Sequence, residues 1–198
     1  MIEHNIELSD GVIALRPPAK RDESAFFEAV SISIPDLSPW LAWCSPEYSI
    51  NDHRSWVARL PGEWQNGTGY AFSVFDKVDG QVLGGCGLSQ VNVNFRLANL
   101  GYWVRSDTRG RGIAPRATRL TAQFGFEELG LVRVEIIVSA HNTPSLRAAE
   151  KTGAHREGVL RNRLVIRDQV HDAVMHSLTP ADFNMALPGL SKCDPLSR

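Results

Sequence analysis

Short apolar runs alternate along the chain with stretches of helical periodicity, which is the pattern of a sheet flanked by helices. The clearest strand covers 132–138, where valine or isoleucine occupies every second position from Val132, so that one face is wholly apolar. We expect this segment to be the central strand. Further strands are expected at 12–15, 70–75, 81–88, 98–104, 164–166 and 170–175.

Four helices are predicted from apolar positions that recur every three or four residues. The first follows Asp22, which is placed to cap it. The others run from Asp52 to Leu60, where Pro61-Gly62 interrupts the pattern, from Gly112 to Gly130, and from Pro144 to Gly153. The alternation of both element types favours an α/β (α+β) fold with about seven strands.

Composition indicates an ordinary globular protein, since 43% of the 198 residues are hydrophobic and 22% are charged. Nothing in the sequence resembles a linker, and we therefore expect a single domain over 1–187. Residues 188–198 are rich in polar residues, Pro and Gly and are expected to form a flexible tail.

The charge balance limits the classes of partner. The formal net charge of -1 argues against nucleic acid as a ligand. Basic character is concentrated in one region, at Arg105, Arg109, Arg111, Arg116 and Arg119. No apolar run approaches the roughly 20 residues that cross a bilayer, so no membrane segment is expected.

Cysteine and histidine spacing indicates neither disulfides nor metal. The three cysteines, Cys44, Cys86 and Cys193, form no CxxC pair, as expected for reduced thiols in a cytoplasmic protein. The six histidines show no HxxxH or HExxH spacing, so no metal site is expected.

The segment from Arg109 to Ala114, with the sequence RGRGIA, has the features of a pyrophosphate-binding loop. Gly110 and Gly112 allow tight turns, and their amides join those at the start of the following helix to form a concave anion site. Arg109 and Arg111 add positive charge at its rim. The chain contains no GxxxxGK[ST] and no GxGxxG motif that opens an N-terminal βαβ unit, so the two commoner phosphate loops are excluded.

Several segments around this loop together resemble the GNAT acetyltransferases, and within them the RimJ/RimL branch that acetylates protein N-termini and some small amines. The loop fits the pattern [RQ]xxGx[GA] that binds the acyl-CoA pyrophosphate in that family. The segments lie between Gly11 and Thr179, and they are LGYWV at 100–104, RGRGIA at 109–114, NTPSLRAAEKTGA at 142–154, REG at 156–158 and VHDAV at 170–174.

This resemblance implies the GNAT fold, a single mixed and mostly antiparallel twisted sheet whose central strands splay apart to hold acetyl-CoA, with no metal. The pyrophosphate would be bound by the backbone of the loop, which comprises Arg109, Gly110, Arg111, Gly112, Ile113 and Ala114. Main-chain groups of Tyr102, Trp103 and Val104 would pair with the pantetheine amides as an added strand would. Asn142 and Ser145 would complete the contacts to the cofactor, although both residues also suit simple helix capping.

The resemblance also suggests catalytic residues. The tyrosine that many family members place on the helix at 145–152 is replaced by Ala149, and Ser145 is therefore the candidate donor to the departing thiolate. Asn99 stands where branch members often carry a basic carboxylate, and it could position a water. Glu135 on the neighbouring strand is an alternative base, with a structural role in the sheet equally open.

Aromatic residues predict an acceptor pocket, with Trp40, Trp43 and Tyr102 as its walls. The leading hypothesis is transfer of an acetyl group from acetyl-CoA to a protein or peptide α-amine. Two alternatives stay open, namely a non-catalytic acyl-CoA-binding module and an acetyltransferase for small amines such as polyamines or antibiotics. The oligomeric state is also left open, with a homodimer as one possibility.

Overall fold

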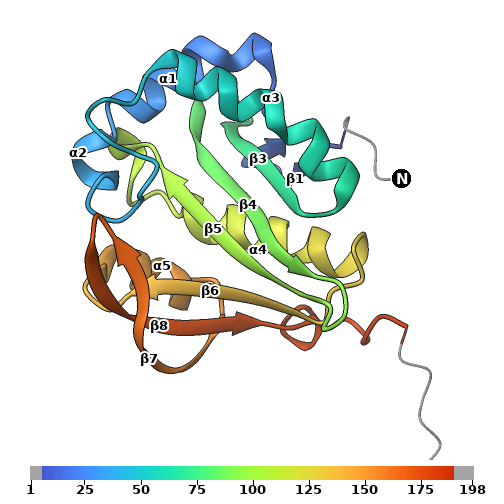
Figure 1. Ribbon diagram of the computed structural model, residues 1–198. Helices are drawn as coiled ribbons and strands as arrows, with labels where there is room; N and C mark the ends of the chain where they lie inside the picture. The colour runs from blue at the N-terminus through green and yellow to red at the C-terminus, as the bar shows by residue number, and fades with distance from the viewer. Residues whose placement is uncertain (1–5, 190–198) are drawn as a thin grey trace, which may run out of the picture.

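A computed structural model describes residues 6–189, and within them the strands form one twisted eight-stranded sheet (Figure 1). Along the sheet the order is β1-β2-β3-β4-β5-β6-β8-β7, and every neighbouring pair is antiparallel except β5 with β6. The strands are β1 (Leu8–Ser9), β2 (Ile13–Arg16), β3 (Gly69–Asp76), β4 (Val82–Asn92), β5 (Leu97–Val104), β6 (Arg133–Ser139), β7 (His155–Ile166) and β8 (Gln169–Leu178).

The expected α/β architecture is thus confirmed, with one strand more than the seven predicted, because β1 is too short to leave a periodic signal. The segment 132–138 does form an interior strand, β6, although β4 and β5 are the middle pair of the sheet. The proposed tail at 188–198 lies almost wholly outside the described residues.

Helices cover both faces of the sheet. They are α1 (Glu23–Ser31), α2 (Ile34–Leu37), α3 (Ile50–Asn66), α4 (Ile113–Glu127) and α5 (Thr143–Lys151), with 3-10 turns at Lys20–Asp22, Ser106–Thr108 and Pro180–Phe183. In Figure 1 α1 and α3 lie above β3 and β4, whereas α4 runs behind the sheet. The larger core cluster joins α4 to the sheet through Phe72, Leu100, Phe124 and Ile136, and a smaller cluster surrounds Phe26 and Trp103 on the α1 side.

The predicted interruption of the second long helix at Pro61 is wrong, since α3 continues to Asn66. Ser49 and Asp52 form a reciprocal capping box at its start, and Gly67 ends it with φ 68°. Proline in a helix interior removes one backbone hydrogen bond. Burial of Leu60 and Trp64 on either side of the exposed Pro61 offsets that loss.

Strands β5 and β6, the parallel pair, separate over most of their length. Leu97, Ala98 and Asn99 of β5 pair with Arg133, Val134 and Glu135 of β6, and in residues 6–189 this is the whole of their pairing. From Leu100 onward β5 therefore presents its backbone to a gap. This gap is the splay between central strands that the sequence led us to expect.

Candidate active site

A cavity of about 760 Å³ occupies the gap between β5 and β6, and we call it the cofactor cleft. Its walls come from Leu100–Val104 of β5, from 136–139 of β6 and from the loop and helix start at 108–115. Residues of α5 and the α2 loop also line the cleft, together with Leu164 and Ile166 of β7. Segments far apart in the sequence thus converge on one space.

The glycine loop forms one end of the cleft and has the conformation that the sequence predicts. Gly110 and Gly112 have φ values of 82° and 75°, a region that side chains other than glycine rarely adopt. A Cβ atom built on either glycine meets no atom within 4 Å, so the backbone here borders open space. Gly112 caps α4 without a side chain, and the first amides of the helix, at Ile113 and Ala114, have no side-chain cap. This cradle fits an anionic group such as a pyrophosphate.

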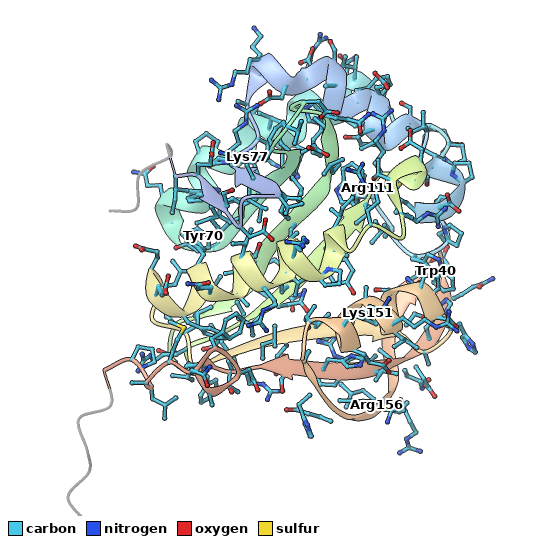
Figure 2. The ribbon with its side chains drawn as sticks, turned by 180° about the vertical axis from the view of Figure 1, so that it is seen from behind. Trp40, Tyr70, Lys77, Arg111, Lys151 and Arg156 are labelled. Atoms are coloured by element: carbon cyan, nitrogen blue, oxygen red, sulfur yellow. The ribbon has the colours of Figure 1, made fainter. Side chains whose placement is uncertain are left out.

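The arginines around the loop are engaged by carboxylates. Arg109 forms an ion pair with Asp36 of α2, and Arg111 is 2.8 Å from Asp76 at the end of β3. The Arg109 guanidinium also contributes most to holding the pKa of Asp36 below its usual range, with a hydrogen bond from Ser106. The positive charge expected at the rim is therefore already partly neutralised within the chain. Arg109 lines the cleft, whereas Arg111 points toward β3 outside it (Figure 2).

The start of α5 forms the opposite wall of the cleft. Asn142 caps this helix, since its Oδ1 accepts a hydrogen bond from the Ser145 amide at 3.2 Å. The Tyr102 hydroxyl, which comes from β5, donates to the Ser145 carbonyl at 2.9 Å and lies 3.1 Å from Ser145 Oγ. Burial raises the pKa of Tyr102 to about 12, so the phenol stays protonated at neutral pH. Ala149 is fully buried one turn further along the helix.

A second cavity, of about 900 Å³, lies under α3, and we call it the acceptor cavity. It shares Gly101, Tyr102 and Trp103 with the cofactor cleft, so the two cavities meet at this stretch of β5. Small residues of three strands form its floor, namely Ala71 of β3, Gly85, Gly87 and Ser89 of β4, and Gly101 of β5. A Cβ atom at Gly101 would meet nothing within 4 Å, which confirms that the floor is open there.

The two tryptophans predicted to line one pocket lie in different cavities. Trp43 is 47% exposed, lines the acceptor cavity and makes an edge contact to Trp103 at 6.2 Å between ring centroids. Trp40 instead lines the cofactor cleft, on the side of α5 and Lys151 (Figure 2). The two tryptophans diverge because the chain turns at 38–43 and directs their side chains to different sides.

Asn99 borders neither cavity. It pairs with Ser89 of β4 and with Glu135 of β6, in the one stretch where β5 still has both partners. Its Oδ1 is buried, and within the described chain no hydrogen bond to it is present. Glu135 forms an ion pair with Arg133. The structure thus brings Ser145 and Tyr102 together at the junction but leaves Asn99 and Glu135 away from it.

Sequence reasoning missed three charged residues that line the acceptor cavity and one long-range contact made by a neighbour of the cavity-lining Trp43. Asp52, Arg59 and Glu63 line it from α3, and their helical spacing places them on one side of the helix, a signal that was present in the sequence. Arg167, in the turn between β7 and β8, donates to the Cys44 carbonyl at 2.8 Å. This contact joins two segments 123 residues apart, and the local sequence carries no sign of it.

In residues 6–189 no group of three or more His, Cys, Asp or Glu side chains is arranged to hold a metal ion. In the same range no helix is both long and apolar enough to cross a membrane. His176 is fully buried in β8.

Comparison with known proteins places these features in one family. The family model described as the acetyltransferase (GNAT) domain matches residues 13–155. YdaF of Bacillus subtilis (strain 168), named as a candidate ribosomal N-acetyltransferase, is 35% identical over 105 residues, which are 53% of this chain and 57% of YdaF. The spermidine N(1)-acetyltransferase of Escherichia coli (strain K12) is 29% identical over 96 residues, or 48% of this chain and 52% of that protein. Among solved structures, Mycobacterium smegmatis RimJ in complex with a CoA disulfide superposes with a TM-score of 0.81 at 26% identity, covering 92% of this chain and 90% of RimJ.

Proposed function

The chain belongs to the GNAT acetyltransferase family and is an acetyl-CoA-dependent N-acetyltransferase, and we propose that its acceptor is the α-amine of a peptide or protein N-terminus. The observation that carries this proposal is the meeting of the two cavities at Gly101, Tyr102 and Trp103. An elongated donor in the cleft and an amine in the acceptor cavity would come together there. The name of YdaF supports a protein acceptor, whereas the name of the spermidine enzyme supports a polyamine.

The residues present fit acetyl-CoA. The open cradle at Gly110 and Gly112 would hold the pyrophosphate through backbone amides, as an anion at a helix N-terminus is held. The edge of β5 at Tyr102–Val104 that faces the gap would pair with the pantetheine amides. Bound acetyl-CoA supplies an activated thioester carbonyl.

The chain's own groups then assist the transfer. The neutral amine forms the new C–N bond at the thioester carbon, the C–S bond breaks, and the amine proton leaves to solvent. A backbone amide near Gly101–Trp103 would stabilise the oxyanion, and the Ser145 hydroxyl would donate to the departing thiolate. Because a thiol has a pKa of about 8.5, one hydrogen-bond donor is sufficient help for the leaving group.

The proposed preference for an α-amine follows from the carboxylates in the acceptor cavity, which are weak bases. A hydrogen bond from Ser49 keeps the pKa of Asp52 low, and one from Ser45 does the same for Glu47. Glu63 lies at Gly69 of β3, two strands away from Gly101. Without a strong base at the junction, the amine has to arrive neutral. At pH 7 an α-amine with a pKa near 8 is neutral on the order of 10² times more often than a lysine amine with a pKa near 10.4.

A comparison of three acceptors tests this proposal. We expect kcat/KM to be highest for a peptide that begins with Ala or Ser, compared with its N-blocked lysine counterpart and with spermidine. For the peptide, kcat/KM should rise up to about pH 8 and then level off as the α-amine loses its proton. A clear preference for the lysine peptide or for spermidine would refute the α-amine proposal and leave the family assignment intact.

A further inference from the structure

The Tyr102 phenol connects the two walls of the cofactor cleft. It reaches from β5, where the strand has already separated from β6, to the first turn of α5. There its hydroxyl lies within hydrogen-bond distance of both oxygens of Ser145, 2.9 Å from the carbonyl and 3.1 Å from Oγ. Tyr102 also borders both cavities, so this contact lies where donor and acceptor would meet.

The hydrogen bonds leave Ser145 little freedom. Its amide donates to Asn142 Oδ1, and its carbonyl accepts from Tyr102, so the backbone is held on two sides. The remaining variable is the direction of the Ser145 O–H bond. The phenol has one proton, so it donates either to the Ser145 carbonyl or to Oγ. When it donates to Oγ, that oxygen is occupied as an acceptor, and the serine proton is free to point into the cleft. A phenol is protonated at neutral pH, and burial disfavours the phenolate further by raising the pKa of Tyr102 to about 12.

We propose that Tyr102 is a positioning residue for acetyl transfer, whose hydroxyl holds Ser145 so that the serine proton faces the departing CoA sulfur. The inference rests on the role proposed above for Ser145. No covalent bond to Tyr102 or Ser145 forms. As the C–S bond breaks, the thiolate accepts a hydrogen bond from Ser145, which in turn accepts one from Tyr102, and such a chain strengthens each donor.

The substitution Tyr102→Phe tests this role because it removes one oxygen and keeps the ring that borders both cavities. We expect kcat to fall about 10-fold, which is less than the loss typical of removing the proton donor itself and fits the loss of one supporting hydrogen bond. The KM for acetyl-CoA should stay within about twofold, since the proposed contacts of Tyr102 to the cofactor are made by its main chain. The assay uses whichever amine the wild-type enzyme acetylates, so its outcome does not depend on the α-amine proposal.

A double-mutant cycle separates positioning from a structural effect. If Tyr102 acts through Ser145, Tyr102→Phe should have no further effect on kcat in the Ser145→Ala background. Multiplicative losses in the double variant, an unchanged kcat in Tyr102→Phe, or a loss confined to the KM for acetyl-CoA would each overturn the proposal.

Two controls keep the result interpretable. Tyr70→Phe removes the hydroxyl of a buried tyrosine that is packed against Phe124, and its melting temperature gives the stability cost of losing a tyrosine hydroxyl that does not contact Ser145. Replacing Tyr102 by 3-fluorotyrosine retains the ring and the hydroxyl, and it should restore kcat at pH 7. A fluorotyrosine enzyme as slow as Tyr102→Phe would also contradict the proposal.

Discussion

The cradle for the cofactor can be tested at a single glycine, because Gly112 has a closely matched counterpart elsewhere in the chain. Gly112 has φ 75°, and Gly80, between β3 and β4, has φ 74°. A Cβ atom at either position meets nothing within 4 Å. Replacing each glycine by alanine therefore imposes the same backbone strain without a steric clash, and only Gly112 borders the cofactor cleft.

The expected effect on stability is equal for the two variants. A left-handed conformation costs an L-residue about 1–2 kcal/mol. In a protein of this length, each kcal/mol lowers the melting temperature by about 2–4 °C, so both variants should melt about 2–8 °C below the wild type. Thermal denaturation without ligand measures this shift.

The expected effect on CoA binding differs between the variants. A methyl group on Gly112 would occupy space that the pyrophosphate needs, and the loss of one hydrogen bond to a charged oxygen costs about 1.5–3 kcal/mol, or about 10- to 100-fold in Kd. Gly80→Ala should bind CoA as the wild type does. Calorimetric titration of CoA into each variant provides the measurement. Equal affinity in Gly112→Ala and Gly80→Ala would refute the assignment of the loop as the pyrophosphate site.

Three further predictions concern single charged side chains. Asp36→Asn frees Arg109 for the cofactor and should lower the KM for acetyl-CoA by up to about fivefold, as expected for an exposed ion pair worth about 0–1 kcal/mol; a raised KM would contradict this. Arg167→Ala removes the bond to the Cys44 carbonyl and should raise the KM of the acceptor severalfold while calorimetry shows an unchanged Kd for CoA. A hydrogen bond from Arg133, and a smaller contribution from Ser177, lower the pKa of Glu157 to about 2. The ionised carboxylate therefore stabilises the folded protein above its ordinary pKa of 4.5. This stability is lost as the pH falls toward 2. Urea unfolding should therefore show Glu157→Gln to be less stable than the wild type at pH 7, with a gap that narrows by pH 3; a constant gap would exclude this linkage.

The features that could be predicted from the sequence are those that depend only on neighbouring residues. The glycine loop was recognisable because only glycine adopts positive φ readily, and the cap at Asn142 because it precedes a proline-initiated helix. Pro61 misled the prediction because its effect depends on the buried neighbours that hold α3 together. The cap is local, whereas burial is a property of the whole fold.

The site's pairings could not be predicted in the same way. Tyr102 and Ser145 are 43 residues apart, and Arg109 meets an aspartate of α2 more than seventy positions earlier. Such contacts depend on how strands and helices are placed relative to one another. The sequence nominated Ser145 and Tyr102 separately, and only the fold joins their hydroxyl groups.

The separation of β5 from β6 gives the sheet two edges in its interior. Exposed strand edges ordinarily invite pairing with strands of other molecules. Here each edge faces the other across a gap that α5, the α2 loop and β7 also line, so neither edge lies on the outer margin of the sheet. A molecule that carries amide groups can pair with such an edge as an added strand does. If acetyl-CoA pairs with β5 as proposed above, it would be a removable element of the sheet, and each catalytic cycle would complete the sheet and open it again.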